Sequence, residues 1–281
     1  MTLTPPQASG EKAAYFQLFG LIIADSLEVH TVFEILNGQL ITVHMPELSL
    51  IIPAYNESAN LPLLLHRAAE VFTNSPVELI LVDNGSTDQS PAILAELLPN
   101  HPFARSIRVP VNQGYGYGIL SGLRSAQSRF LGWTHADLQT DPGDVLRGLE
   151  LLRHSNDPAR TFVKGKRYGR PPADVFFTAG MGAFETAILQ KPLWDINAQP
   201  TLFSKTFFET WKNPPHDFSL DLFAYFMARE QGLRVEKFPV NFGKRAHGVS
   251  RWNVNWKAKM KFIRRTVDYS LTLSKQLRKT S

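Results

Sequence analysis

A cluster of polar side chains follows a short apolar run near the middle of the chain. His135, Asp137 and Gln139 come after residues 130–133 and offer an imidazole, a carboxylate and an amide oxygen. Alternate residues of an extended chain point to the same side, so these three groups can face one ligand. Side chains of these types bind divalent metals. The spacing therefore predicts a binding site lined by metal-competent side chains.

A simpler interpretation is that two aspartates only cap the next helix. Asp137 and Asp141 precede Pro142 and Gly143, where helical spacing begins, and an aspartate before a helix is more often a cap than a ligand. The motifs in the rest of the chain favour the binding site.

The elements that position the cluster alternate between strand, polar loop and helix. Apolar strands are predicted at residues 46–53, 78–83, 106–109 and 130–133, with helical spacing after each loop. This order predicts an α/β fold with a mainly parallel sheet flanked by helices. In such sheets ligands bind beyond the carboxyl ends of the strands, where these polar loops lie.

Composition excludes several classes of protein. The 281 residues include 43% hydrophobic residues, enough for a large core, and no cysteine, so disulfides and thiol catalysis are excluded. The longest apolar run, residues 18–24, is shorter than the roughly 20 residues that span a bilayer. No signal peptide is expected, because Glu11 and Lys12 precede that run without a basic leader. The expected location is cytoplasmic.

The net positive charge of the chain comes from its C-terminal end. From Arg251 onward nine basic residues accompany one acidic residue, a net +8 against +5 for the whole chain, so the first 250 residues carry −3. A mildly acidic body argues against nucleic acid as a partner.

The chain divides into three predicted parts. Residues 1–44 form an N-terminal extension without strong motifs, interpreted either as dispensable, with Met45 as an alternative start, or as a packed extra helix. Residues 45–252 form the main domain, and residues 253–281 a basic amphipathic C-terminal helix. The apolar stripe of that helix faces either an anionic membrane or the domain itself; its residues are Trp252, Trp256, Met260, Ile263, Val267 and Leu271.

Four motifs give the chain a specific resemblance. Residues 51–57 (IIPAYNE), 81–88 (LVDNGSTD), 112–114 (NQG) and 136–139 (ADLQ) occur in an order and spacing that resemble the family 2 glycosyltransferases of GT-A fold. The similarity covers about residues 47–252 and is greatest to the dolichol-phosphate mannose synthase-like branch, which transfers sugar from a nucleotide to a polyprenyl phosphate.

The resemblance implies a nucleotide site on the first loops. It assigns nucleotide binding to residues within the four motifs: Pro53, Tyr55, Glu57, Asp83, Gly114 and Asp137. A carboxylate such as that of Asp83 can accept a hydrogen bond from a base N–H. The alternatives are that Asp83 is a turn residue and that Tyr55 is a packing aromatic.

The resemblance also implies a divalent metal, Mg²⁺ or Mn²⁺, at Asp137 and Gln139, bridging the diphosphate. His135 departs from the family pattern, which often has an acidic residue there. Either the metal has fewer protein oxygens, or Mn²⁺ is preferred because imidazole suits it better, or His135 points elsewhere.

Further basic residues resemble the family's phosphate-binding positions. Arg167 matches an arginine of the acceptor half, the alternative being a surface arginine. Arg245, Ser250 and Arg251 lie in a Gly-containing loop whose donors can converge on one anion, and Arg245 is also a catalytic candidate. Asp217 is interpreted equally as a catalytic base or as a helix N-cap.

The resemblance implies an inverting, metal-assisted transfer from a nucleoside-diphosphate sugar to a polyprenyl-phosphate or glycan acceptor. An ionised phosphate needs no general base, whereas a sugar hydroxyl requires a carboxylate such as Asp217 or Asp195. The rival prediction is a non-catalytic nucleotide-sugar-binding subunit of a glycan assembly system. A membrane-held acceptor is consistent with a cytoplasmic protein that is peripheral at the inner face of the membrane.

Overall fold

The computed structural model describes residues 31–36, 39–247 and 256–280, with side chains described for residues 45–247, 260 and 263–275. Two compact units, Met1–Met45 and Pro46–Ser281, make up the chain. In the first unit the strands β1 (Thr31–Leu36) and β2 (Gln39–His44) pair as an antiparallel hairpin.

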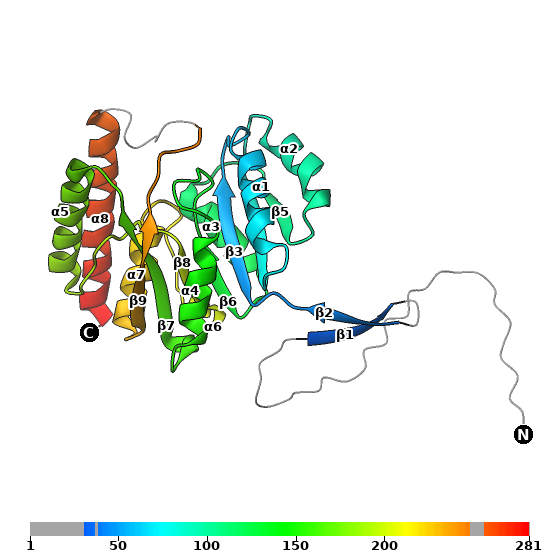
Figure 1. Ribbon diagram of the computed structural model, residues 1–281. Coiled ribbons are helices and arrows are strands. Elements are labelled where there is room, and N and C mark those ends of the chain that lie inside the picture. The colour runs from blue at the N-terminus through cyan, green and yellow to red at the C-terminus, as the bar shows by residue number, and fades with distance from the viewer. Residues whose placement is uncertain (1–30, 37–38, 248–255, 281) are drawn as a thin grey trace, which may run out of the picture. The chain divides into compact units, whose positions relative to one another are not determined.

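The second unit is built on a seven-stranded sheet with the order β5-β4-β3-β6-β8-β7-β9 (Figure 1). Every pair is parallel except the two that β8 makes, with β6 and with β7. The strands are β3 (Leu48–Ala54), β4 (Val77–Asn84), β5 (Ala104–Val109), β6 (Phe130–Trp133), β7 (Thr161–Tyr168), β8 (Thr201–Ser204) and β9 (Arg234–Asn241).

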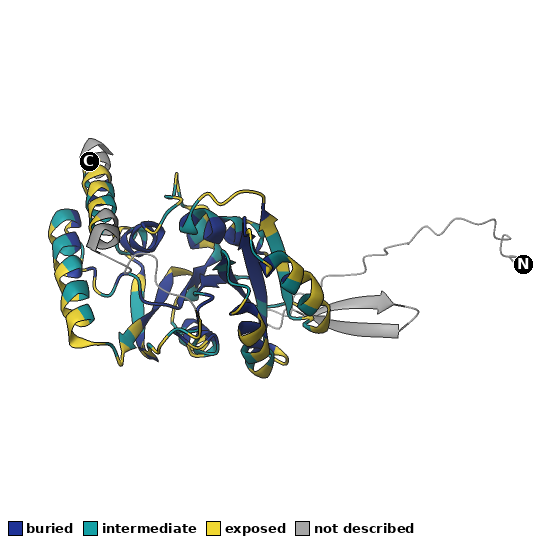
Figure 2. Ribbon diagram, turned by 90° about the horizontal axis from the view of Figure 1, so that it is seen from above, coloured by how far each residue is buried: buried dark blue, intermediate teal, exposed yellow. Residues whose placement is uncertain are grey.

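Helices cover both faces of the sheet, because alternate strand residues project to opposite sides. Ile51 packs in a core with α3, α6 and α7, whereas its neighbours Leu50 and Ile52 pack in a second core with α1, α2 and α4. The strands β3, β4, β6 and β8 are accordingly almost wholly buried, and exposed residues concentrate on the outer helices (Figure 2). The helices are α1 (Leu61–Phe72), α2 (Ser90–Leu97), α3 (Tyr115–Ser125), α4 (Asp144–Arg153), α6 (Lys205–Glu209) and α7 (Leu220–Glu230), with 3₁₀ turns η1 (Leu98–Asn100) and η2 (Pro158–Arg160).

Two long helices, α5 (Pro172–Leu189) and α8 (Trp256–Thr280), lie side by side at one end of the unit (Figure 1). Ser270 donates to a carboxylate oxygen of Glu185, and Ser274 Oγ lies 3.5 Å from the carbonyl of Ile188. The residue numbers of the two contacts increase along both helices, so α5 and α8 run in the same direction. Among the described residues, no helix combines the length and the apolar content needed to cross a membrane.

The predicted fold class is confirmed: the sheet is mainly parallel and flanked by helices. The strand predicted at residues 130–133 coincides with β6, and the other predicted strands differ from the observed ones by a few residues at their ends. The antiparallel strand β8, inserted between β6 and β7, is the departure from simple alternation.

Candidate functional site

The polar loops meet at the carboxyl ends of three neighbouring strands, β4, β3 and β6. Strands in a sheet are about 4.8 Å apart, so side chains that follow them are close neighbours. The loop after β3 is bonded to the loop after β4, because Asn56 N donates to Ser86 Oγ at 3.0 Å and Thr87 N donates to Asn56 Oδ1 at 2.8 Å. Asn56 has a φ of 57°, a left-handed conformation that asparagine tolerates.

Asp83, the last residue but one of β4, is a buried carboxylate, 2% exposed. Its Oδ1 accepts a hydrogen bond from Ser86 N at 2.9 Å. Its Oδ2 is buried and, among the described residues, accepts no hydrogen bond, although Arg108 Nε lies 3.5 Å away. A buried acceptor without a donor is costly, so this oxygen is suited to a ligand N–H.

The loop of Gly114 adjoins Asp83 through the next residue of β4. Asn84 Nδ2 donates to the Gly114 carbonyl at 2.9 Å, and Gly114 N donates to Asn112 Oδ1 at 2.9 Å. Pro53, at the end of β3, also lies against α3, since a Cβ on Gly118 would come within 3.3 Å of Pro53 Cβ. These contacts join three of the predicted nucleotide-binding positions in one wall.

Tyr55 and Glu57 lie in the loop that follows β3, at the same edge, and both side chains are partly exposed. Glu57 Oε2 accepts from Asn60 Nδ2 at 2.5 Å, and Glu57 N donates to Ser90 Oγ at 3.0 Å. The structure thus places Glu57 where it fixes the start of α1 and the loop after β4.

Asp137 lies beyond β6 and is 5% exposed. Its Oδ1 accepts from Gln139 N at 3.2 Å, while its Oδ2 pairs with Arg245 Nη2 at 2.8 Å. Between Asp137 and Gln139, Leu138 has a φ of 56°, an uncommon conformation for a non-glycine residue. Strained backbone of this kind persists only when the surroundings hold it in place.

The segment after β9 provides much of that support. Gly243 N donates to the Gln139 carbonyl at 2.7 Å, Gln139 Nε2 donates back to the Gly243 carbonyl at 3.1 Å, and Ala246 N lies 3.3 Å from the Asp137 carbonyl. The His247 carbonyl in turn lies 3.4 Å from Asn60 Nδ2. Residues 243–247 therefore bridge the loops after β6 and β3.

Asp141, the other aspartate of the cluster, has a local role. Its Oδ1 accepts from Gly143 N at 2.8 Å, and its carboxylate pairs with Arg67 at 2.8 Å. These contacts hold the turn before α4 and join it to α1, whereas α4 itself has no side-chain cap bond.

His135 stacks on Tyr115, with ring centroids 5.5 Å apart and an interplanar angle of 28°. Over the described residues, no three His, Cys, Asp or Glu side chains converge as metal ligands would. The donor set at the loop is therefore one carboxylate, Asp137, with the amide of Gln139 beside it. A magnesium or manganese ion bound by one or two carboxylates and by substrate phosphates fits this set.

Arg167 and Arg170 form a cationic pair at the end of β7. Arg167 Nε donates to Asp195 Oδ1 at 2.9 Å and Arg170 Nη1 lies 3.5 Å from the same oxygen, while the Phe242 ring packs under both guanidinium groups. Burial alone would raise the pKa of Asp195, but the charge and hydrogen bonds of Arg167 lower it below its ordinary value. The two arginines share the single carboxylate of Asp195, so this cluster of three side chains keeps a net positive charge.

Asp217 precedes α7 and uses both carboxylate oxygens. Oδ1 accepts from Ser219 N at 2.9 Å, and Oδ2 pairs with Arg265 Nε of α8 at 3.1 Å. The first contact holds the turn before the helix but is not an N-cap bond, because the N-cap residue of α7 is Ser219 and no side chain caps the helix. Ser250 and Arg251, predicted to bind phosphate, lie outside the described residues.

Sequence reasoning missed a buried polar group beneath the loops. Asp221 is 2% exposed and accepts from Trp133 Nε1 at 3.1 Å and from Gln199 Nε2 at 2.6 Å. The pKa of the nearby Tyr115 hydroxyl is raised well above its ordinary value. Burial is the largest cause, and the negative charges of Asp221 and Asp137 add to it. A carboxylate inside the apolar run of α7 is the signal that could have identified this group.

Lys164, within β7, is also fully buried and was missed. Its Nζ donates to the Ala198 carbonyl at 2.7 Å and to Thr201 Oγ1 at 3.2 Å. Burial lowers the pKa of Lys164 to about 7. The lysine thus ties β7 to the loop that leads into β8.

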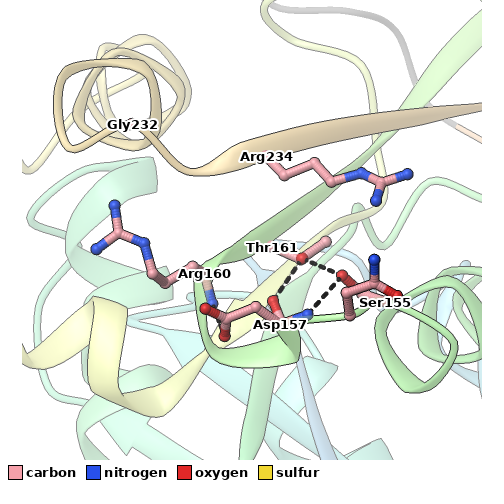
Figure 3. A pocket seen from close by; sticks show the side chains of 7 residues that line it. Ser155, Asp157, Arg160, Thr161, Gly232 and Arg234 are labelled. Carbon is pink, nitrogen blue, oxygen red and sulfur yellow. Dashed lines mark hydrogen bonds between the residues drawn. The ribbon is translucent and has the colours of Figure 1, made fainter.

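A hollow of about 220 Å³ at the opposite edge of the sheet does not belong to this site (Figure 3). It is bordered by the amino-terminal ends of β7 and β9, where Thr161 and Arg234 begin the strands. Its two guanidinium groups are occupied, because Arg160 donates to the Gln231 carbonyl at 2.8 Å and Arg234 pairs with Glu236 at 2.8 Å. We assign no ligand to it.

Comparison with known sequences adds a family match. The model of "Glycosyl transferase family 2" matches residues 49–214. An undecaprenyl-phosphate 4-deoxy-4-formamido-L-arabinose transferase of Yersinia enterocolitica is 34% identical over 119 residues, covering 41% of this chain and 36% of its own length. The corresponding protein of Edwardsiella ictaluri is 26% identical over 214 residues, covering 73% and 63%. The chain thus spans less than two thirds of these relatives.

Solved structures share the fold. A mannosyltransferase of Pyrobaculum calidifontis in complex with GDP-Man and Mn²⁺ has a TM-score of 0.55 and 19% identity, covering 73% of this chain and 59% of that one. Glucosyl-3-phosphoglycerate synthase of Mycobacterium tuberculosis in complex with Mn²⁺, UDP and its product has a TM-score of 0.60 and 18% identity, covering 82% and 80%. At these identities the likeness concerns the fold.

Proposed function

The chain belongs to glycosyl transferase family 2 and has the GT-A fold, and from this premise we propose that it transfers a sugar from a nucleoside diphosphate to a polyprenyl phosphate. The observation that carries the proposal is that two buried carboxylates, Asp83 and Asp137, lie at the same edge of the sheet. Asp83 Oδ2 accepts no hydrogen bond among the described residues, and Asp137 Oδ2 pairs with Arg245. The relatives named as undecaprenyl-phosphate sugar transferases support the acceptor class.

The donor nucleotide lies across the loops after β3 and β4. The Asp83 Oδ2 atom accepts an N–H of the base, which supplies the partner that this buried oxygen lacks among the described residues. Pro53, Tyr55 and Glu57 flank the base and ribose, and Gly114 lies in the same wall as Pro53, where its carbonyl accepts from Asn84.

The diphosphate lies against the loop of Asp137 and Gln139. These two residues would hold the divalent cation, which would supply charge stabilisation for the departing nucleoside diphosphate. Arg245 adds a guanidinium at the same place, where its planar fork matches phosphate oxygens. Ser250 and Arg251 belong to the same proposed phosphate site by their position in the sequence. His135 contributes by stacking, given its contact with Tyr115.

The acceptor phosphate lies at the end of β7, at Arg167 and Arg170, and not at the loops that hold the donor. Both guanidinium groups are mostly buried, share Asp195 and are backed by Phe242, so their planes are held for bidentate contact. A phosphate oxygen is already ionised near neutral pH and attacks without a general base. This agrees with Asp217, whose two oxygens are engaged by Ser219 and Arg265.

A polyprenyl acceptor requires the enzyme to work at a lipid surface, and α5 offers an apolar face for it. The exposed residues of α5 carry no charge; they are Pro172, Ala173, Val175, Phe176, Ala179, Gly180, Ala183 and Ala187. The Phe176 residue is 83% exposed, and α5 starts just after Arg170. Water-exposed helices normally present polar residues, so we propose that this face lies in the headgroup region of an anionic membrane, at the cytoplasmic side.

The basic helix α8 supports the same orientation. Two members of its predicted apolar stripe, Met260 and Leu271, are each 42% exposed, whereas Tyr269, Ser270 and Leu273 form the side packed on the domain. The tryptophan side chains of the stripe lie outside the described set. A helix with exposed apolar and basic residues is typical of those that lie in a membrane interface, and α8 packs against α5.

The proposal is tested with the purified chain, undecaprenyl phosphate in anionic vesicles, and labelled UDP-, GDP- and dTDP-sugars with Mn²⁺ or Mg²⁺. We expect one donor to give a lipid-linked sugar in a metal-dependent reaction. Because the attack is in line, the product anomer is expected to be the opposite of the donor's. Nucleotide binding without transfer to any acceptor would favour the non-catalytic subunit instead, and a retained anomeric configuration would exclude inversion.

A further inference from the structure

We propose that Arg265, on α8, is a positioning residue for the loop that carries Asp137. It acts through a column of stacked side chains that runs from α8 to His135. The proposal rests on the proposed function only for the identity of the ligand at Asp137, because the column itself is defined by contacts.

The outer end of the column is a three-residue contact. Arg265 Nε pairs with Asp217 Oδ2 at 3.1 Å, and its guanidinium carbon lies 5.5 Å from the centroid of the Phe218 ring. One guanidinium thus holds a carboxylate at its edge and an aromatic ring under its face, a combination that a lysine cannot reproduce. The turn before α7 is fixed to α8 by this contact.

The inner end of the column is aromatic. The Phe218 and Tyr115 rings are stacked with centroids 4.5 Å apart and an angle of 10°, and Tyr115 stacks in turn on His135. Stacked aromatic pairs contribute about 0.5–1.5 kcal/mol beyond the area that they bury. The side chain of Arg265 is therefore linked to His135 without a gap.

The backbone reinforces this link. Tyr117 N donates to the His216 carbonyl at 2.9 Å, so the turn that carries Asp217 and Phe218 is bonded to the first turn of α3. A Cβ on Gly114 would lie 2.5 Å from the His216 carbonyl oxygen, and one on Gly116 would lie 2.6 Å from that of Asp217. The glycines permit an approach so close that the two segments must move together.

His135 matters because it is two residues before Asp137. The intervening loop continues into Leu138, whose φ of 56° needs support from its surroundings. Residues 243–246 support one side of the loop through Gln139 and Asp137. The column supplies a second support at His135, and it is the one that communicates with α8.

The competing interpretation is that Arg265 only anchors α8. Other contacts already anchor that helix, namely the bond of Ser270 to Glu185 and the buried side chain of Leu273. Removal of Arg265 should therefore leave α8 docked and alter the loop instead. This difference separates a positioning role from a purely structural one.

The first test is hydrogen exchange of the full chain without ligand or lipid, comparing Arg265→Ala with Arg264→Ala. Arg264 is the adjacent arginine of α8, with an 85% exposed side chain paired only weakly, at 3.8 Å, with Asp268 in the described region. We expect amides of residues 134–140 to exchange about tenfold faster in Arg265→Ala alone, with α5 and α8 as protected as in the parent. Equal exchange in both variants would overturn the proposal.

The second test measures binding of Mn²⁺ with UDP and of Mn²⁺ with GDP, again without lipid. Supports of metal ligands typically change affinity by about 10–100-fold, so Arg265→Ala should weaken binding about tenfold, Arg265→Lys should recover only part of it, and Arg264→Ala should bind as the parent. If the parent bound neither nucleotide, the proposed function would fail while the exchange experiment still decided the role of Arg265.

A double-mutant cycle completes the design. Phe218 and Tyr115 separate Arg265 from His135 in the column, and substitutions at separate sites normally add within about 0.5 kcal/mol. If the column acts as a unit, Arg265→Ala should have little further effect on Mn²⁺ binding in a His135→Ala background. Full additivity would overturn the relay even if each variant were impaired.

Discussion

Arg245 Nη2 lies 2.8 Å from Asp137 Oδ2, so the carboxylate proposed to hold the metal is paired with a cation from the segment after β9. Arg245 would therefore compete with a divalent ion for Asp137. The guanidinium would bind a phosphate of the donor once this pair is broken. The contact thus joins metal binding to the position of residues 243–247.

This relationship predicts opposite effects of Arg245→Gln on two affinities. Without nucleotide, Mn²⁺ should bind about tenfold more tightly, because the competing charge-assisted hydrogen bond is removed. With a nucleoside diphosphate, binding should weaken, because a phosphate donor is lost. Manganese titrations followed by electron paramagnetic resonance measure both. Lys244→Gln, which removes an exposed neighbouring charge, serves as control; the same direction of change in both titrations would argue against competition.

The two aspartates after β6 should differ sharply. Asp137→Asn removes the one carboxylate beside Gln139 and should reduce metal-dependent transfer by roughly 10²-fold or more, since the charge stabilisation supplied by a metal amounts to several kcal/mol. Asp141→Asn only breaks an exposed ion pair with Arg67, which contributes about 1 kcal/mol or less, so transfer should persist. Initial rates with and without Mn²⁺ distinguish them, and equal losses would mean that Asp137 is structural.

Asp83 should recognise the base and not the phosphates. Asp83→Asn replaces the acceptor Oδ2 by a group that can present a donor to the base N–H, and the resulting mismatch costs about 1–3 kcal/mol. Calorimetry should then show at least a roughly tenfold loss of UDP or GDP affinity in the presence of Mn²⁺. Pyrophosphate with Mn²⁺ is the matched ligand without a base, and its affinity should stay unchanged. A parallel loss for pyrophosphate would place Asp83 at the phosphates.

The parts of the fold that the sequence could predict are those with continuous apolar strands. Residues 130–133 correspond to β6, and the run at 78–83 lies within β4, because strands buried on both faces contain few polar residues. The polar loops that follow them were recognisable for the same reason: each begins where the apolar run stops. Their meeting at one edge follows from parallel pairing.

Contacts made by distant segments could not be predicted in this way. The pairing of Asp217 with Arg265 depends on where α8 docks, and the burial of Asp221 depends on Trp133 and Gln199 from two other segments. No local pattern encodes either partner. The same is true of β8, whose antiparallel place between β6 and β7 is set by tertiary packing.

The apolar face of α5 leads to a prediction about lipid binding. Phe176→Ser removes a ring that is exposed in the protein and that would be buried in the headgroup region, where a phenylalanine contributes about 1.5–3 kcal/mol. Sedimentation with anionic vesicles should show at least a roughly tenfold weaker association. Leu63→Ala, which truncates a 43% exposed leucine on α1, is the matched control and should bind normally. Unchanged binding of both variants would remove α5 from the membrane contact.

Glu185 lies between α5 and α8 and should make stability depend on pH. Burial raises the pKa of Glu185 to about 7, offset in part by the hydrogen bond from Ser270. Since the folded pKa is above that of the unfolded chain, the folded state holds the proton more tightly. The stabilisation is complete below the unfolded pKa and is lost as the pH rises through about 7.

Glu185→Gln keeps an acceptor for Ser270 and cannot ionise, so it should flatten this dependence. A shift of this size corresponds to at most about 3 kcal/mol, and urea unfolding near pH 5 and near pH 8 measures it. We expect the parent to lose stability between these conditions, and the variant to lose less and to exceed the parent near pH 8. Asp268→Asn, at an exposed carboxylate on α8, should retain the parent's slope. A variant that lost stability as steeply as the parent would show that Glu185 ionises without cost, and that the pH dependence has another origin.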